Sequence, residues 1–110
     1  RSLAERGVWL EFDMIGMPYR FTLAGEGQSP APHESAIAIQ RLCRAGFGGR
    51  ILISHDLFLK SMLRKNGGNG LAYIPAVFLD RLLDLGVDET VVRSLNTTNV
   101  RDLFELAARV

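Results

Sequence analysis

Two short segments of the chain have patterns of apolar and polar residues that are typical of β-strands. The first segment, GVWLEFDMI at residues 7–15, is rich in branched and aromatic residues and stops at Gly16. The second, RILISH at residues 50–55, begins with a more uniformly apolar run. We predict a strand over each segment. In the first strand, alternation places Val8, Leu10, Phe12 and Met14 on one face, and Trp9, Glu11 and Asp13 on the other.

Between the two predicted strands, residues 32–45 repeat their apolar positions with a helical period. Ile39, Leu42, Cys43 and Gly46 stand at i, i+3, i+4 and i+7, so that one side of a helix can lie on a sheet. Strand, helix, strand is the order of a βαβ unit, which implies parallel strands and a right-handed crossover.

Helical patterns continue after the second strand. Residues 57–65 can form a short helix that ends at the turn NGGNG, residues 66–70. Pro75 suits the first position of a further helix, and Gly86 suits the left-handed residue that closes it.

The last part of the chain carries two more capping signals. Asp88 is a good N-cap for a short helix through Leu95, and Thr98 or Asn99 is expected to cap the final helix. That helix has an apolar stripe formed by Val100, Leu103, Phe104 and Ala107.

Two parallel strands need cover on both faces and neighbours on both edges. We therefore expect the chain to be part of something larger, or to associate as a homo-oligomer.

Composition narrows the class of protein. The 110 residues fit one domain, and 13 basic against 12 acidic residues leave a net charge of +1, so no electrostatic footprint for nucleic acid or an anionic membrane is expected. No apolar run approaches the length of a transmembrane helix. Cys43 is the only cysteine, which excludes an internal disulfide and favours a reducing, cytoplasmic compartment.

Two glycine-rich stretches could suggest phosphate-binding loops: AGFGGR at residues 45–50, and NGGNG. Each follows a predicted helix, whereas a dinucleotide-binding fingerprint must follow a strand and open a helix. NGGNG also lacks the lysine–serine pair of a Walker motif. We interpret both as turns.

The end of the second strand carries the candidate chemistry, because α/β folds bind their ligands there. His55 is more simply a residue that packs against helices or bonds to the backbone than a metal ligand. Asp56 is open to two interpretations: a cap for the segment that follows, or a metal or catalytic ligand. Glu11 and Asp13 share a strand face that must meet water, cations or a polar cavity. No His-x-His pair, HExxH motif or Cys/His cluster is present, so this sequence by itself cannot complete a metal site.

Several stretches of the sequence resemble those of a known family. The stretch ILISHDLFLKSMLRKNGGNGLAYI, followed by a helix, LGV and LNTTNVRDLF, is similar to the C-terminal end of the phosphotriesterase-related proteins. GVWLEFDMIG, the long loop and AIAIQRLCRAGFGGR match in order and spacing. These proteins belong to the phosphotriesterase and lactonase group of metal-dependent hydrolases in the amidohydrolase superfamily.

The resemblance implies an α/β fold of the (β/α)₈ TIM-barrel type. Residues 7–15 would be strand 7 and residues 50–55 strand 8, followed by the terminal helices, and residues 1–110 would be the C-terminal portion of one barrel domain. Family members hold two divalent metal ions, usually Zn²⁺, at the barrel mouth. The ligands are a His-x-His pair, a carboxylated lysine or glutamate, two further histidines and an aspartate that ends strand 8. Asp56 matches that aspartate, so the resemblance favours Asp56 as metal ligand and catalytic residue.

One position departs from the family pattern. Met14 stands directly after Asp13, where related hydrolases often place a histidine or arginine near the substrate. Met14 is therefore the candidate substrate-binding residue, and a preference for phosphotriesters or lactones does not carry across. Alternation, however, puts Glu11 and Asp13, not Met14, opposite the apolar face. A bend at the strand end could resolve this conflict.

The expected function is metal-dependent hydrolysis of a small-molecule ester, lactone or related substrate. The alternative is a barrel relative that has lost turnover and binds a small molecule. In either case residues 16–34 and 57–70 follow the ends of strands and are expected to border the site, with their glycines making them candidate lids.

Overall fold

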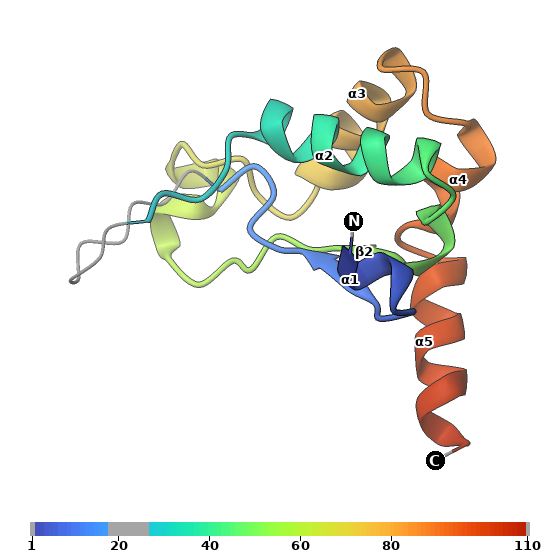
Figure 1. Ribbon diagram of the computed structural model, residues 1–110. Helices are drawn as coiled ribbons and strands as arrows, with labels where there is room; N and C mark the ends of the chain where they lie inside the picture. The colour runs from blue at the N-terminus through green and yellow to red at the C-terminus, as the bar shows by residue number, and fades with distance from the viewer. Residues whose placement is uncertain (1, 18–26, 110) are drawn as a thin grey trace.

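A two-stranded parallel sheet lies at the centre of the computed structural model, which describes residues 2–17 and 27–109 (Figure 1). The strands are β1 (Leu10–Phe12) and β2 (Ile51–Ile53), and α2 (Pro32–Arg44) connects them. The predicted parallel βαβ order is confirmed.

Both strands are shorter than the predicted segments. The register pairs Leu10 with Ile51, so residues 7–9 could pair only with residues 48–50. That stretch forms a 3₁₀ turn, η1 (Gly48–Arg50), and offers no strand edge. β1 therefore begins at Leu10. A short helix that the sequence pattern did not predict, α1 (Ser2–Glu5), precedes it.

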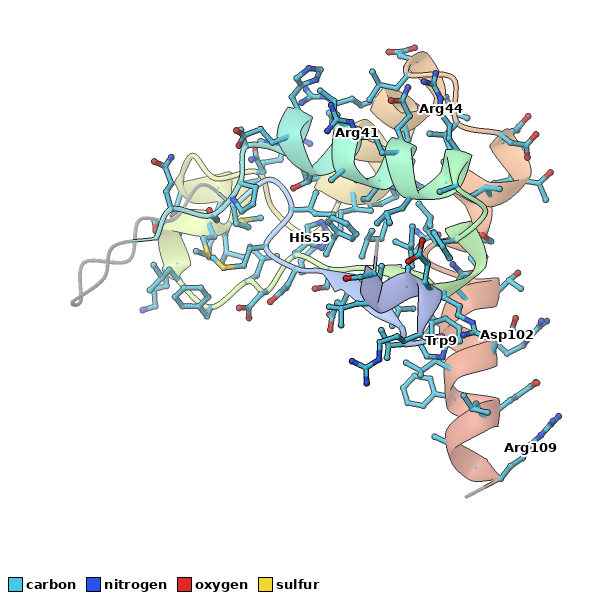
Figure 2. The ribbon with its side chains drawn as sticks, in the orientation of Figure 1. Trp9, Arg41, Arg44, His55, Asp102 and Arg109 are labelled. Carbon is cyan, nitrogen blue, oxygen red and sulfur yellow. The ribbon has the colours of Figure 1, made fainter. Side chains whose placement is uncertain are left out.

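Helix α2 begins at the predicted residue, ends one residue before the predicted end, and lies over one face of the sheet (Figure 1). Ile39 is fully buried on the side that faces the sheet, whereas Arg41 and Arg44 lie on the side turned away from it (Figure 2). Gly46, at φ 88°, takes the left-handed conformation that follows the helix end.

The helix predicted to begin at Pro75 is present, but its first turn is π-helical. The turn η4 (Ile74–Phe78) contains Pro75 and runs into α3 (Leu79–Asp84). Gly86 closes α3 at φ 79°, as predicted, and its N–H donates to the Leu83 carbonyl at 2.8 Å.

The N-cap predicted for the next helix is also confirmed. Asp88 precedes α4 (Glu89–Ser94), and its Oδ1 accepts hydrogen bonds from the backbone N–H groups of Thr90 and Val91 at 2.9 and 3.3 Å. These bonds satisfy two of the N–H groups that the first turn of a helix leaves without a partner.

The cap predicted for the last helix is wrong. Helix α5 (Thr98–Ala108) follows Thr97 as its N-cap residue, and Thr98 and Asn99 are both inside the helix. Asn99 is buried, and its Nδ2 donates to the carbonyls of Gly48 and Ile51, each at 2.8 Å. The amide thus completes the backbone hydrogen bonding at the start of β2 instead of capping its own helix.

The helix predicted over residues 57–65 is also absent. Two separate 3₁₀ turns stand there, η2 (Lys60–Met62) and η3 (Arg64–Asn66), with Leu63 extended between them. The glycine turn that follows folds back on this segment. Gly68 N–H donates to the Leu63 carbonyl and Gly70 N–H to the Met62 carbonyl, so two acceptors that a continuous helix would use are taken.

One hydrophobic core lies between the sheet and helices α2, α3 and α4. Its buried members come from both strands' neighbourhoods and all three helices: Ile15, Ala36, Ile39, Ile51, Ile74, Phe78, Leu82, Val87, Val92 and Leu95. Helix α5 begins beside β2 and extends away from this core (Figure 1). In the described part of the chain no helix has the length and apolar character needed to cross a membrane.

Candidate functional site

The two strand ends carry unusual backbone conformations. Met14 and Asp56 are the only described residues other than glycine with a positive φ, at 56° and 50°. Each stands just beyond the C-terminal end of a strand. Aspartate tolerates the left-handed region, but a methionine there is uncommon. The two residues that the sequence singled out for substrate and metal contact are therefore the two with this backbone conformation.

The conformation of Met14 arises from an offset in the pairing of the strands. Ser54 N–H donates to the Phe12 carbonyl at 3.0 Å, so a regular parallel ladder would continue from Met14 N–H to the Ser54 carbonyl. Instead, Ile15 N–H donates to that carbonyl at 3.1 Å. One residue is therefore inserted on the first strand, as in a β-bulge.

This bulge is a bend of the kind that could resolve the conflict over the faces of the first strand. Beyond Phe12 the alternation of side chains no longer holds, because Met14 is left-handed and Ile15 takes the pairing position. Ile15 is fully buried and belongs to the core, while Met14 is half-buried. Alternation would place Ile15 on the face of Glu11 and Asp13, which are exposed, but Ile15 lies in the core instead.

Two carboxylates and one hydroxyl meet beside the bulge. Ser54 Oγ lies 2.5 Å from Asp13 Oδ1 and 3.0 Å from Glu11 Oε1. Asp13 Oδ1 also accepts a hydrogen bond from Met14 N–H at 2.7 Å. Glu11 and Asp13 are both exposed, which agrees with the expectation that their face meets a polar environment.

His55 lies on the helix-covered side of the sheet and has a structural role (Figure 2). Its Nε2 accepts a hydrogen bond from Ile74 N–H at 3.1 Å, at the first residue of η4. Burial lowers the pKa of His55, which favours the neutral ring that this bond requires. The interpretation of His55 as a residue that bonds to the backbone is confirmed.

Asp56 has an exposed side chain that accepts no hydrogen bond from any residue the structure describes. The segment directly after it is not helical, since the first turn, η2, begins at Lys60 after Leu59. The interpretation of Asp56 as a helix cap therefore has no hydrogen bond to support it. Among the described residues no group of three His, Cys, Asp or Glu side chains could hold a metal ion.

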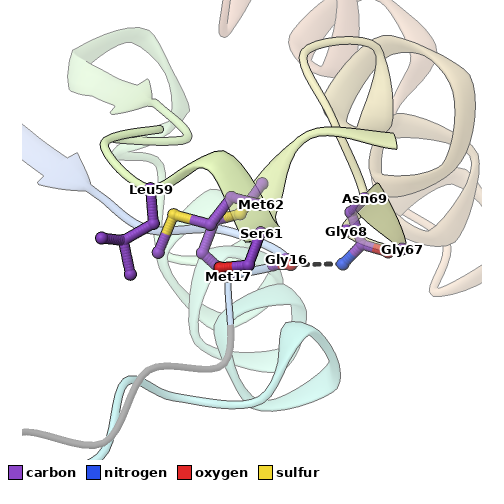
Figure 3. Close-up of a pocket in the computed structure, with 8 residues that line it drawn as sticks. All are labelled: Gly16, Met17, Leu59, Ser61, Met62, Gly67, Gly68 and Asn69. Atoms are coloured by element: carbon purple, nitrogen blue, oxygen red, sulfur yellow. Dashed lines mark hydrogen bonds between the residues drawn. The ribbon is translucent and has the colours of Figure 1, made fainter. Parts of the chain in front are cut away.

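A cavity of about 380 Å³ lies between the segments that follow the two strands (Figure 3). Gly16 and Met17 line it from the first segment, and the second contributes Leu59, Ser61, Met62, Gly67, Gly68 and Asn69. Both methionines are nearly fully buried, so the cavity offers sulfur and aliphatic surface beside backbone groups. Residues 18–26 of the predicted lid lie outside the described residues.

Asn69 and Tyr73 both contact Gly16, at the start of the segment that follows β1. Asn69 Nδ2 donates a hydrogen bond to the Gly16 carbonyl (Figure 3). The Tyr73 ring occupies the space that a Cβ on Gly16 would need. Gly16 has φ 74°, and there is no room for a Cβ at this position. Both the backbone conformation and the lack of space favour glycine over any other residue here. Sequence reasoning found the two segments but missed the roles of Ser54 and Asn69, whose partners lie 41 and 53 positions away.

Relatives with assigned names match most of this chain. An N-acetyltaurine hydrolase from Dictyostelium discoideum is 30% identical over 104 residues, which are 94% of this chain and 28% of that protein. A protein of the same name from Salmo salar is 30% identical over 101 residues, 89% of this chain and 28% of that protein. The chain thus spans less than a third of the length of these relatives.

Solved structures contain the same arrangement of strands and helices. A resiniferatoxin-binding protein from Rhodobacter sphaeroides is 46% identical and superposes with a TM-score of 0.87, over 94% of this chain and 28% of that one. A phosphotriesterase homology protein from Escherichia coli, solved with phosphate in its active site, is 22% identical with a TM-score of 0.75, over 89% of this chain and 31% of that one. The second likeness is one of fold alone.

The family model described as the phosphotriesterase family matches residues 1–104. The resemblance found in the sequence is thereby confirmed, and the chain belongs to the phosphotriesterase family.

Proposed function

We propose that this chain is the last part of a (β/α)₈-barrel hydrolase, with β1 and β2 as strands 7 and 8 and Asp56 as a metal ligand. The observation that carries the proposal is the position of Asp56. It is an exposed carboxylate at the C-terminal end of the second parallel strand, in a chain of the phosphotriesterase family. Barrel enzymes place their catalytic side chains at this end of the strands.

The described residues would supply one ligand of a metal centre and not the complete set of ligands. Asp56 offers carboxylate oxygens of the kind that Zn²⁺ binds, and the other ligands would come from outside this chain. A divalent metal pair, when bound, lowers the pKa of water and polarises a scissile carbonyl or phosphoryl oxygen. Asp56 would add a carboxylate able to take a proton from the attacking water.

The names of the relatives narrow the substrate class. N-acetyltaurine is an amide, and hydrolysis of an amide, ester or lactone starts with attack of water on an acyl carbon. We therefore propose a small carboxylic acid derivative as substrate, with Met14 and the cavity between the two segments in contact with it. A hydrophobic methionine in place of a basic residue favours a neutral group at that position.

The test of the proposed function is Asp56→Asn in the complete protein. Asparagine keeps an oxygen but loses the charge and the base, so we expect near-native melting, weakened metal occupancy and turnover reduced by at least about a hundredfold. The matched control is Asp88→Asn, because Asp88 is an N-cap and asparagine caps equally well. Turnover of Asp56→Asn within a few-fold of the parent would contradict the proposal.

A second candidate function is binding without turnover. It is favoured by the 46% identity to a structure described as a resiniferatoxin-binding protein. Calorimetry with a neutral apolar ester, run beside a hydrolysis assay on the same ester, separates the two functions. Binding with no product would support the binding protein, and product formation that Asp56→Asn abolishes would support the hydrolase.

A further inference from the structure

The bulge at the end of β1 needs a hydrogen-bond acceptor other than the one that a regular ladder supplies. A regular ladder would give Met14 N–H the Ser54 carbonyl as its acceptor, and the methionine would then avoid the left-handed region. In the structure Ile15 has taken that acceptor, which leaves the Met14 N–H in need of another. Asp13 Oδ1 provides it at 2.7 Å.

Ser54 orients the carboxylate that does this. A serine hydroxyl has one proton, and the shorter of its two carboxylate contacts, 2.5 Å against 3.0 Å, goes to Asp13. Asp13 therefore receives a hydrogen bond from each side of the bulge, one from the Met14 backbone and one from the neighbouring strand. Glu11 shares the hydroxyl but bonds to no backbone group of the bulge.

We propose that Asp13 is a positioning residue that selects substrate through Met14. Its carboxylate, held by Ser54, keeps Met14 at φ 56° and so fixes the direction in which the methionine side chain leaves the strand. The inference rests on the proposed function, because it takes Met14 as a residue that contacts substrate. Asp13 itself needs no contact with substrate or metal in this role.

The test compares kcat/KM for two substrates, an acyl ester and an N-acyl amide, in the complete protein. Asp13→Ala is expected to change the ratio of the two values by at least about tenfold, because the bulge loses its acceptor. Asp13→Asn is expected to keep the parent ratio, since its amide oxygen still accepts from Met14 N–H. Glu11→Ala, on the same face and touching the same serine, is the matched control and is expected to leave the ratio unchanged.

A double substitution tests whether Asp13 acts through Met14. In a Met14→Ala background, Asp13→Ala is expected to change the ratio by less than about twofold, because the side chain that it positions is gone. An undiminished effect in that background would overturn the proposal. So would a ratio unchanged by Asp13→Ala, or a ratio changed equally by Asp13→Ala and Asp13→Asn.

Hydrogen exchange separates this inference from the proposed function, since it needs no substrate. The Met14 amide is expected to exchange at least about tenfold faster in Asp13→Ala than in the parent or in Asp13→Asn. If the protein shows this exchange pattern but hydrolyses no substrate, the bulge contact is supported and the proposed role of Asp13 in substrate selection is overturned. Equal exchange rates in all three proteins would overturn the bulge contact itself.

Discussion

Asn99 joins the last helix to the start of β2 through two hydrogen bonds, and its side chain is 2% exposed. Asn99→Ala would leave the carbonyls of Gly48 and Ile51 without this donor in a buried place. Such a loss costs about 1–3 kcal/mol. We expect a lower melting temperature of the complete protein, by several degrees, without a matching change in KM.

The matched control is Asn96→Ala. Asn96 is exposed in the turn before the same helix, so its removal should leave the melting temperature nearly unchanged. Equal melting temperatures for Asn99→Ala and the parent would show that water replaces the amide, and would contradict the prediction.

Individual residues differ in how far the sequence predicted their roles. Asp88 and Gly86 were predictable because caps act on backbone groups within a few positions. Asp56 could be placed at the end of a strand by the apolar run before it. The bulge at Met14 could not be predicted, because it depends on which carbonyl of β2 its neighbour Ile15 reaches.

At the scale of elements, Asn69 connects the segment after β2 to the segment after β1, because its side chain donates a hydrogen bond to the Gly16 carbonyl. Asn69→Ala removes that bond without disturbing the buried core. We expect faster hydrogen exchange around residues 14–17 and 66–70, a raised KM, and little change in melting temperature.

Asn66→Ala is the control for this effect. Asn66 Nδ2 donates to the Lys60 carbonyl at 2.6 Å, so it bonds within its own segment and does not bridge the two. Faster exchange at residues 14–17 in this variant as well would mean that the segment acts as one unit and that Asn69 has no special role.

The helices show where the periodicity of apolar residues is sufficient to predict an element and where it is not. The α2 pattern predicted the helix to within one residue because one side of the helix, with Ala36, Ile39, Leu42 and Cys43, packs in the hydrophobic core. Residues 57–65 have good helix formers, yet form two 3₁₀ turns because the following glycines take the carbonyls of Met62 and Leu63. Local propensity is overridden there by a contact within the same loop.

At the scale of the whole molecule, the two-stranded sheet has unpaired edges in the described part of the chain and helix α5 has exposed apolar side chains, and both kinds of surface favour contact with further strands or helices. Each strand has one edge without a neighbouring strand among the described residues. On α5, Phe104, a member of the predicted apolar stripe, is 69% exposed, and Leu106, outside that stripe, is 52% exposed. Such surface is covered in a barrel by further strands and helices.

The isolated 110-residue chain is therefore expected to self-associate and to melt broadly, because unpaired edges and exposed aromatic surface favour association. Sedimentation and thermal melting in dilute solution measure both properties. Phe104→Ser should reduce association more than Leu71→Ser, since Leu71 is as exposed but stands outside the apolar stripe of α5. A monomer with a sharp two-state melt would contradict this prediction, and would show instead that the core between the sheet and helices α2, α3 and α4 is sufficient to stabilise the chain alone.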